Sequence, residues 1–259
     1  METLMQDAEG MVVNDRLACY VEADTADDPA DATTFGYGFG FDDVWFISTS
    51  GDQDDDMPYE YFHFFVDEVI ATNANGVPYK RFDLMKERMI FSVADDDARD
   101  PNRYYALDPA YQQWWEKGKD IPFTVWDRQV LADNVVRFDI YCLGWDGRGW
   151  MAGTSAGLHE FDSTVGPNIP GLSAAEKEKY RNVPPAAFDI YLQVTSPEVG
   201  QESGPALLPG VDAATQLKAR EKMIRDSSSI FGRAVPLTGA ARFNISVVYG
   251  TNNTSYYQP

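Results

Sequence analysis

Residues 153–157 read Gly-Thr-Ser-Ala-Gly and match the G-x-S-x-G pattern of a serine nucleophile elbow. In that motif a strained turn between a buried strand and a helix exposes a serine hydroxyl, which a histidine deprotonates. The segment before Ser155 is rich in glycine, and Gly166 and Pro167 end any following helix early. His159 lies only four residues after Ser155, too close for an ordinary catalytic triad. We therefore interpret this motif as a loop of small residues and predict a protein that is not an enzyme.

Aspartates form a second candidate site, because hard oxygen ligands at alternating positions suit calcium. The two clusters contain Asp52, Asp54 and Asp56, and Asp95 and Asp97. The first cluster is not an EF-hand loop, because Met57 stands where that loop needs glycine and His63 where it needs a bidentate glutamate. Two interpretations remain: acidic loops that face solvent, or a calcium site of another kind. Apart from this possible calcium ion, the sequence predicts no cofactor, since it contains no phosphate-binding or dinucleotide-binding motif.

Tryptophans are the third group of interest because their flat faces can stack on sugar rings. The tryptophans concerned are Trp114, Trp115, Trp145 and Trp150. The same side chains also serve protein interfaces and cores as large, rigid contact surfaces. The residue types alone leave carbohydrate binding, subunit contact and core packing open.

The composition limits the class of partner. The chain has 259 residues, 44% of them hydrophobic, which is enough to fill a core. It carries 21 Lys and Arg against 41 Asp and Glu, a net charge of −20, so its field repels nucleic acids and anionic lipids, and we predict no nucleic-acid partner. No apolar run reaches the roughly 18 to 20 residues of a membrane helix, and residues 1–15 lack the pattern of a signal peptide. The sequence as it stands predicts a soluble chain without an export signal.

Alternation of apolar and polar residues predicts antiparallel strands. The predicted strands are residues 44–47, 59–72, 78–93, 135–143, 187–196 and 242–249, and the glycine-alternating segment 35–41 precedes them. Residues 73–76 read Asn-Ala-Asn-Gly, a composition typical of a hairpin loop. Pro184 and Pro185 stand just before strand 187–196, where a proline is tolerated. We expect strands 135–143 and 187–196 to be neighbours that a long, irregular connection joins.

Helices are predicted from capping residues and from a period near 3.6. An amphipathic N-terminal helix is indicated by Leu4, Met5, Ala8, Met11, Val12, Leu17 and Ala18. Ser173 and Glu176 form a capping box, further helices are predicted at 109–117 and 212–230, and 94–123 is otherwise interpreted as a loop. Cys19 and Cys142 are too far apart for a CxxC motif, so a disulfide and two buried thiols both remain open.

Residues 130–197 carry a resemblance to a known family. The relevant segments are Val-Leu-Ala-Asp-Asn-Val at 130–135, Phe-Asp-Ile-Tyr at 138–141, a turn rich in Trp and Gly, and Val-Pro-Pro-Ala-Ala-Phe at 183–188. This arrangement resembles the J-type minor pseudopilins of type II secretion systems and the prepilin-like cassette proteins of Verrucomicrobia. In that family a Leu-Pro-x-Ala-Val segment stands where this chain has its Pro-Pro-Ala-Ala-Phe variant.

The resemblance implies an α+β, pilin-like fold, with an N-terminal helix packed on an antiparallel β-sheet and long decorated loops. It implies one soluble domain over residues 1–259, in which 1–22 are the remnant of the N-terminal helix and 35–259 the β-rich globular part. The family's basic leader, Phe-Thr-Leu-x-Glu processing site and apolar helix are missing here, so the resemblance requires that they were removed. Trp145 and Trp150 correspond to the family's Trp-bearing loop, which implies packing or subunit contact for both.

The function implied by the resemblance is that of a non-enzymatic structural subunit in a type II secretion pseudopilus or a type IV pilus-like fibre. Its partners would be other minor and major pseudopilins or pilins, and the missing helix would anchor it in the inner membrane, facing the periplasm or the exterior. The alternative is a secreted carbohydrate-binding or carbohydrate-active β-protein, which the aromatic loops allow. The native N-terminus discriminates between a pilin-type helix and a cleavable signal peptide.

Overall fold

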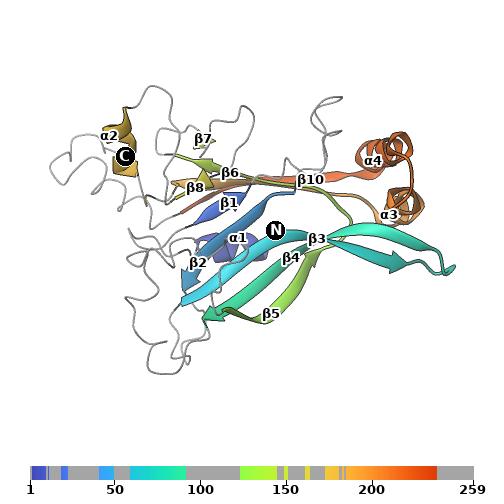
Figure 1. Cartoon of the computed structure of the whole chain (residues 1–259), viewed down its shortest axis with the longest axis horizontal. Coiled ribbons are helices and arrows are strands. Elements are labelled where there is room, and N and C mark those ends of the chain that lie inside the picture. Colours follow the sequence, from blue (N-terminus) through green and yellow to red (C-terminus); the bar gives the residue numbers. More distant parts are fainter. Residues whose placement is uncertain are drawn as a thin grey trace.

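Two antiparallel sheets dominate the computed structural model of this chain (Figure 1). The structure describes residues 2–9, 11, 19–22, 41–49, 59–91, 123–144, 149–150, 161–163, 173–180, 183 and 185–237. The six-stranded sheet has the order β5 (Phe123–Ala132), β4 (Pro78–Phe91), β3 (Tyr59–Thr72), β2 (Asp43–Thr49), β1 (Tyr20–Glu22) and β8 (Phe161–Asp162). The four-stranded sheet has the order β10 (Ser229–Pro236), β9 (Ala187–Val194), β6 (Val135–Leu143) and β7 (Gly149–Trp150). Together with the helices, these sheets make the fold mixed α+β, as predicted.

Strands β3 and β4 form a long hairpin of two 14-residue strands. In its turn the Asn73 side chain accepts hydrogen bonds of 3.0 Å from the backbone N–H groups of Asn75 and Val77. Gly76 has a φ of 76°, which glycine adopts without strain. The predicted strands 59–72 and 78–93 and the loop between them are confirmed, and β4 is described as far as Phe91.

The turn after β5 carries the chain from the six-stranded to the four-stranded sheet. Asn134 in this turn has a φ of 53°, a left-handed conformation that asparagine tolerates. Its carbonyl accepts a hydrogen bond of 2.9 Å from the backbone N–H of Thr195. Strand β6 then pairs antiparallel with β9 along its length. The expectation that segments 135–143 and 187–196 are neighbouring strands is therefore confirmed, and β9 ends at Val194.

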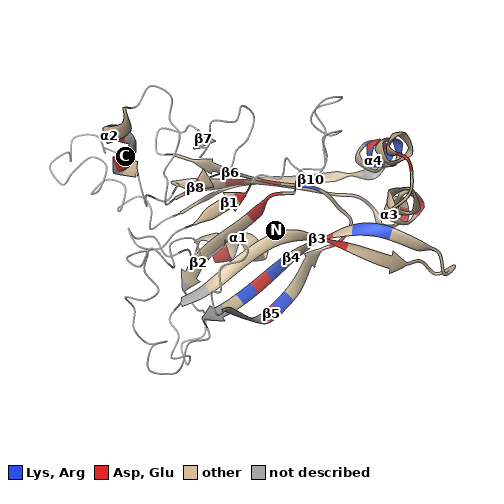
Figure 2. Cartoon of the chain, viewed as in Figure 1, with Lys and Arg blue, Asp and Glu red and all other residues tan. Residues whose placement is uncertain are grey.

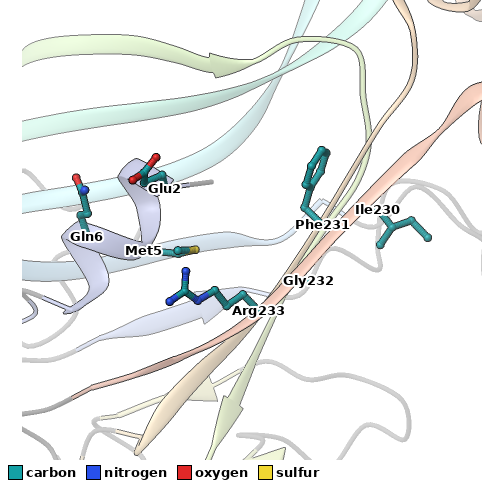
Figure 3. Close-up of a pocket in the computed structure, with 7 residues that line it drawn as sticks. All are labelled: Glu2, Met5, Gln6, Ile230, Phe231, Gly232 and Arg233. Atoms are coloured by element: carbon teal, nitrogen blue, oxygen red, sulfur yellow. The ribbon is translucent and has the colours of Figure 1, made fainter.

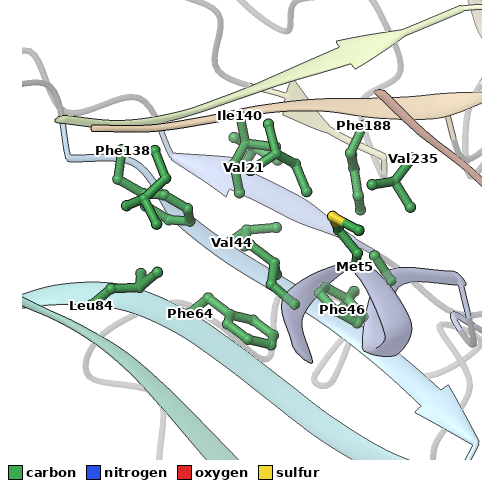
Figure 4. Close-up of a cluster of buried hydrophobic side chains, with 14 of the residues drawn as sticks. Met5, Val21, Val44, Phe46, Phe64, Leu84, Phe138, Ile140, Phe188 and Val235 are labelled. Carbon is green, nitrogen blue, oxygen red and sulfur yellow. The ribbon is translucent and has the colours of Figure 1, made fainter. Parts of the chain in front are cut away.

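Side chains of both sheets pack into one core between them (Figure 4). The six-stranded sheet contributes Val44, Phe46, Phe62, Phe64, Phe82 and Leu84, and the four-stranded sheet contributes Phe138, Ile140, Phe188, Ile190, Leu192 and Val235. Phe46 connects the sheets, because its ring centroid lies 5.7 Å from that of Phe64 and 6.2 Å from that of Phe188. Since side chains alternate along a strand, the residues between these core positions face the outer side of each sheet.

Helix α1 (Glu2–Glu9) adds an apolar face to this core. Its residues Leu4, Met5 and Ala8 are buried in the same cluster. Figure 4 shows Met5 among the core side chains. An N-terminal helix is therefore present as predicted, but it does not reach residue 22. Residues 20–22 form β1 instead, because they pair with β2 and with β8. Val12, Leu17 and Ala18, which extended the helical pattern, lie outside the described residues.

The remaining helices lie near the start and the end of β9. Helix α2 (Ala174–Lys177) and the 3-10 helix η1 (Glu178–Tyr180) precede β9, and the capping box is confirmed, because Ser173 accepts the Glu176 N–H at 3.3 Å and Glu176 accepts the Ser173 N–H at 2.8 Å. Helix α3 (Pro197–Ser203), the 3-10 helix η2 (Gly204–Leu207) and helix α4 (Ala213–Ser227) follow β9. No helix in the described part of the chain is long and apolar enough to cross a membrane.

Two further predicted boundaries are wrong. The helix predicted over 212–230 ends at Ser227, because three consecutive serines are poor helix formers and Ser229 already pairs with β9 as the start of β10. Strand β5 begins at Phe123, which the sequence interpretation placed at the end of a loop. The predicted segments 35–40, 109–117 and 242–249 lie outside the described residues.

Candidate functional site

Most of the candidate residues considered in the sequence lie outside the described part of the chain. They are Asp52, Asp54, Asp56, Asp95, Asp97, Trp114, Trp115, Trp145 and Ser155, the last of which was interpreted as part of a loop. The backbone of Trp150 belongs to β7 and pairs with Cys142 of β6. Among the described residues, no group of three or more His, Cys, Asp or Glu side chains could hold a metal ion. The calcium site and the tryptophan interface therefore stay predictions.

A row of side chains crosses the outer face of the six-stranded sheet. Its members are register partners on five neighbouring strands, namely Tyr20, Trp45, His63, Glu87 and Arg128. The indole of Trp45 stacks on the imidazole of His63, with centroids 4.3 Å apart and planes inclined by 7°. Phe65, two positions along the same strand, also stacks on this imidazole at 4.4 Å. His63 is thus held in an aromatic environment.

Carboxylates hold both nitrogens of His63. Nε2 lies 3.4 Å from Asp43 Oδ2, and Nδ1 lies 3.5 Å from Glu87 Oε2. Burial by itself lowers the pKa of His63, but the hydrogen bonds to Asp43 and Glu87 outweigh burial, so that this pKa lies above its ordinary value of 6.5. The hydrogen bond from His63 also lowers the pKa of Glu87. The charged imidazolium is therefore the favoured form over a wider pH range than in a free peptide.

Arg128 extends this network to β5. Its Nε lies 3.3 Å from Glu87 Oε1, and its Nη2 donates a hydrogen bond of 2.9 Å to Asp67. The guanidinium carbon lies 5.3 Å from the centroid of Phe65. Both ring nitrogens of His63 are engaged by neighbouring strands. We therefore interpret the row as a network that holds the strands together.

A groove of about 660 Å³ opens between α1 and β10 (Figure 3). It is lined by Glu2, Met5 and Gln6 of α1 and by Ile230, Phe231, Gly232 and Arg233 of β10. Figure 3 shows Arg233 extending toward α1, whereas Phe231 and Ile230 leave the strand in different directions. On one side the groove borders the buried core residue Met5, and on the other side it borders exposed residues of the edge strand β10. It is a candidate contact surface for another molecule.

Strand β10 exposes two apolar side chains that are consecutive in the sequence. Ile230 is 68% exposed and Phe231 is 49% exposed. The strand is exposed from its first residue to Ala234, and only Val235 is buried. Arg233 is exposed as well and makes no ion pair or hydrogen bond with another residue in the described ranges. The surface therefore offers apolar contact together with one cation that pairs with no carboxylate among the described residues.

We did not predict this groove from the sequence, because the helix predicted over 212–230 included Ser229 and Ile230, the first two residues of β10. One signal could have revealed the strand. Residues 229–236 read Ser-Ile-Phe-Gly-Arg-Ala-Val-Pro, a segment with aromatic and β-branched residues and no acid, in a chain that contains 41 acidic residues. Proximity to α1 has no such local signal, because the two elements are more than two hundred residues apart.

In comparisons with known proteins, no family model, no curated protein and no solved structure matches this chain. The functional conclusion therefore depends on the residues and contacts described above.

Proposed function

We propose that this protein is a non-enzymatic structural subunit of a pilin-like assembly, either a type II secretion pseudopilus or a type IV pilus-like fibre. The observation that carries the proposal is the groove between α1 and β10, where exposed apolar side chains lie beside the N-terminal helix. A subunit that acts through contacts needs a surface that other proteins can reach, and a groove lined by exposed apolar and charged side chains provides one.

Two further features support the proposal. Strands β6 and β9, which carry the pilin-like motif, are paired in one antiparallel sheet, and the motif's Pro185 is buried just before β9. Helix α1 contributes Leu4, Met5 and Ala8 to the core that this sheet covers. An N-terminal helix packed against an antiparallel sheet is the arrangement that the resemblance implies.

Under this proposal, an apolar helix that precedes α1 anchors the subunit in the inner membrane and later in the centre of the fibre. The globular part then faces the periplasm or the exterior and contacts other minor and major pseudopilins or pilins. The net charge of −20 keeps free subunits apart in solution. Assembly therefore depends on specific contacts that overcome this repulsion.

The mature N-terminus of the protein, isolated from the cells that produce it, tests the proposal. Mass spectrometry of the membrane fraction should find α1 preceded by an apolar helix whose first residue results from cleavage at a Phe-Thr-Leu-x-Glu-type site. A chain released by cleavage of a secretory signal peptide after small residues would contradict the proposal. That result would favour the secreted carbohydrate-binding protein instead.

The absence of enzymatic turnover is part of the same proposal and has its own test. A fluorophosphonate probe that reacts with activated serines should not label Ser155. Labelling of the wild-type protein that disappears in Ser155→Ala would contradict this expectation, because only an activated serine reacts with such a probe. Ser173→Ala serves as the matched control, since Ser173 is an exposed serine that caps α2.

A further inference from the structure

The described strands leave four sheet edges, and three of them carry features that block the addition of a strand. Strands β7 and β8 are only two residues long. Strand β5 is longer, but its register with β4 shifts at two places, and it carries the charged residues Asp127 and Arg128. Short strands, irregular registers and edge charges are the means by which proteins prevent pairing between edges. The remaining edge belongs to β10.

Strand β10 is longer than β7 and β8 and, unlike β5, has no register shift. It pairs with β9 in continuous register over all eight residues, from Ser229 to Pro236. Arg233 is its one charged residue, and its only proline is at the end. Charged residues of both signs cross β4 in the other sheet (Figure 2). An exposed, regular and weakly charged edge is a template for an additional strand.

The face of β10 that borders the groove combines apolar contact with a positive charge. Phe231 and Arg233 alternate with the buried Val235, so all three side chains point to the side on which α1 lies. A strand added to β10 would therefore direct every second side chain into the groove beside Met5. An apolar side chain suits the position near Phe231, and a carboxylate suits the position near Arg233.

We propose that β10 accepts an extended segment of another protein as an additional strand, with an apolar side chain in the groove and a carboxylate that pairs with Arg233. This inference rests on the proposed function as an assembly subunit and names the chemistry of its partner. Backbone hydrogen bonds along the edge of β10 supply affinity, and the alternate side chains in the groove supply specificity.

A second copy of this chain does not meet these requirements. If two copies paired through β10, each would present Arg233 as the only charge of the strand, and neither strand would supply a carboxylate. Each copy also carries a net charge of −20, which opposes self-association at low ionic strength. The occupant is therefore a different protein with a segment that is apolar and carries at least one acidic residue.

Synthetic peptides test the proposal directly on the purified chain. The probes are fluorescein-labelled peptides of eight residues, the length of β10. Valine alternates with threonine in each peptide, and one glutamate replaces a residue at a position that differs from peptide to peptide. At least one peptide should raise fluorescence polarisation on binding. The same peptide with N-methylated amides should not bind, because it cannot donate backbone hydrogen bonds.

Variants at Arg233 test the charge pair. Arg233→Glu should weaken binding of the glutamate peptide by about tenfold, because a charge-assisted hydrogen bond is lost. Arg233→Lys should retain most of the binding. A peptide with lysine in place of glutamate should bind Arg233→Glu more tightly than it binds the wild-type protein. Circular dichroism melts verify that these exposed substitutions leave the fold intact.

Variants at exposed apolar residues locate the binding edge. Phe231→Lys should weaken peptide binding, because Phe231 points to the side on which α1 lies, whereas Val130→Lys on β5 should not, although Val130 is 56% exposed. The proposal is overturned if no peptide binds, if the N-methylated peptide binds equally well, or if both lysine variants have the same effect. Light scattering that finds a dimer lost in Phe231→Lys overturns it in favour of a second copy.

The two proposals fail separately. If a peptide binds β10 but the native N-terminus carries a secretory signal peptide, the strand-binding site is supported and the pilin-like function is contradicted. If the native N-terminus is of the pilin type but no peptide binds, the pilin-like function is supported and β10 is not the docking strand.

Discussion

Lys86 on β4 and Asp7 on α1 form an ion pair of 2.6 Å between residues that are 79 positions apart in the sequence. Lys86 is only 8% exposed and Asp7 20% exposed. The ammonium group also lies 4.7 Å from the ring centroid of Phe62. A lysine is tolerated at this buried position of β4 because Asp7 of α1 neutralises its charge. The ion pair therefore links the N-terminal helix to the six-stranded sheet.

Removal of this carboxylate should destabilise the fold. We expect Asp7→Ala to lower the free energy of unfolding by on the order of 3 kcal/mol, because Lys86 then stays buried without a carboxylate. Urea denaturation measures the change. Lys222→Ala is the matched control, since its pair with Glu202 is also 2.6 Å long but exposed, and should have little effect. Equal destabilisation by the two substitutions would contradict the role of the buried pair.

Gly204 allows η2 to pack closely against β4. A Cβ atom at this position would lie 2.6 Å from the carbonyl oxygen of Lys80 and 2.9 Å from Cβ of Tyr79. Because the backbone of β4 is held by its pairing with β3, we expect Gly204→Ala to cost about 1–3 kcal/mol of unfolding free energy. Thermal and urea denaturation test this, with the exposed Gln201→Ala on α3 as control. Wild-type stability of Gly204→Ala would show that η2 does not approach β4 so closely.

The His63 network predicts a specific dependence of stability on pH. The hydrogen bonds of His63 raise its pKa. Its contribution to the free energy of unfolding is therefore fully present below the ordinary pKa of 6.5 and is lost as the pH rises through the raised pKa. The lowered pKa of Glu87 has the opposite effect: its contribution is present above 4.5 and is lost as the pH falls through the lowered pKa.

Urea midpoints measured across this range test the network. The midpoint of the wild-type protein should fall above pH 6.5 more steeply than that of His63→Gln. His159→Gln controls for the other histidine of the chain. Parallel pH profiles for the wild type and His63→Gln would mean that the two carboxylates do not act on His63.

Both cysteines are predicted to be unreactive in the folded protein. Cys19 and Cys142 are free thiols in the core. Burial raises the pKa of both thiols, and the charge of Asp162 raises that of Cys19 further. Ellman's reagent should therefore react with neither thiol in native buffer and with both in urea. Rapid reaction in native buffer would contradict their burial, and reaction in urea only after reduction would indicate the disulfide that the sequence left open.

Strand alternation predicted β3 and β6 with their observed bounds, because each strand has one face in the core between the sheets. Strand β5 was missed because it mixes apolar and charged residues along the edge of its sheet, where packing constrains the pattern weakly. Strands β1, β7 and β8 are too short for a local pattern. They exist because neighbouring strands offer them hydrogen bonds.

The candidate sites could be predicted far less well than the strands. The row that contains His63 depends on the register of five strands, and no local spacing reveals that Trp45 and Glu87 flank the same imidazole. The groove requires α1, at the start of the chain, to lie against β10 near residue 230. Such long-range placement follows from packing of the whole core and not from periodicity.

Photo-cross-linking at β10, in the cells that produce the protein, tests the central claim most directly. A photoreactive amino acid at position 231 replaces Phe231 in the groove, and the same amino acid at position 130 replaces Val130 on the edge strand β5 as the matched control. Both positions are exposed, so the two proteins differ in which edge carries the reactive group.

We expect a discrete cross-linked product at position 231, in which mass spectrometry identifies a different protein with a pilin-type N-terminal helix, and no such product at position 130. Identical products at both positions, no product at position 231, or a cross-linked partner that lacks this helix would contradict the claim that the protein is an assembly subunit with β10 as its docking strand.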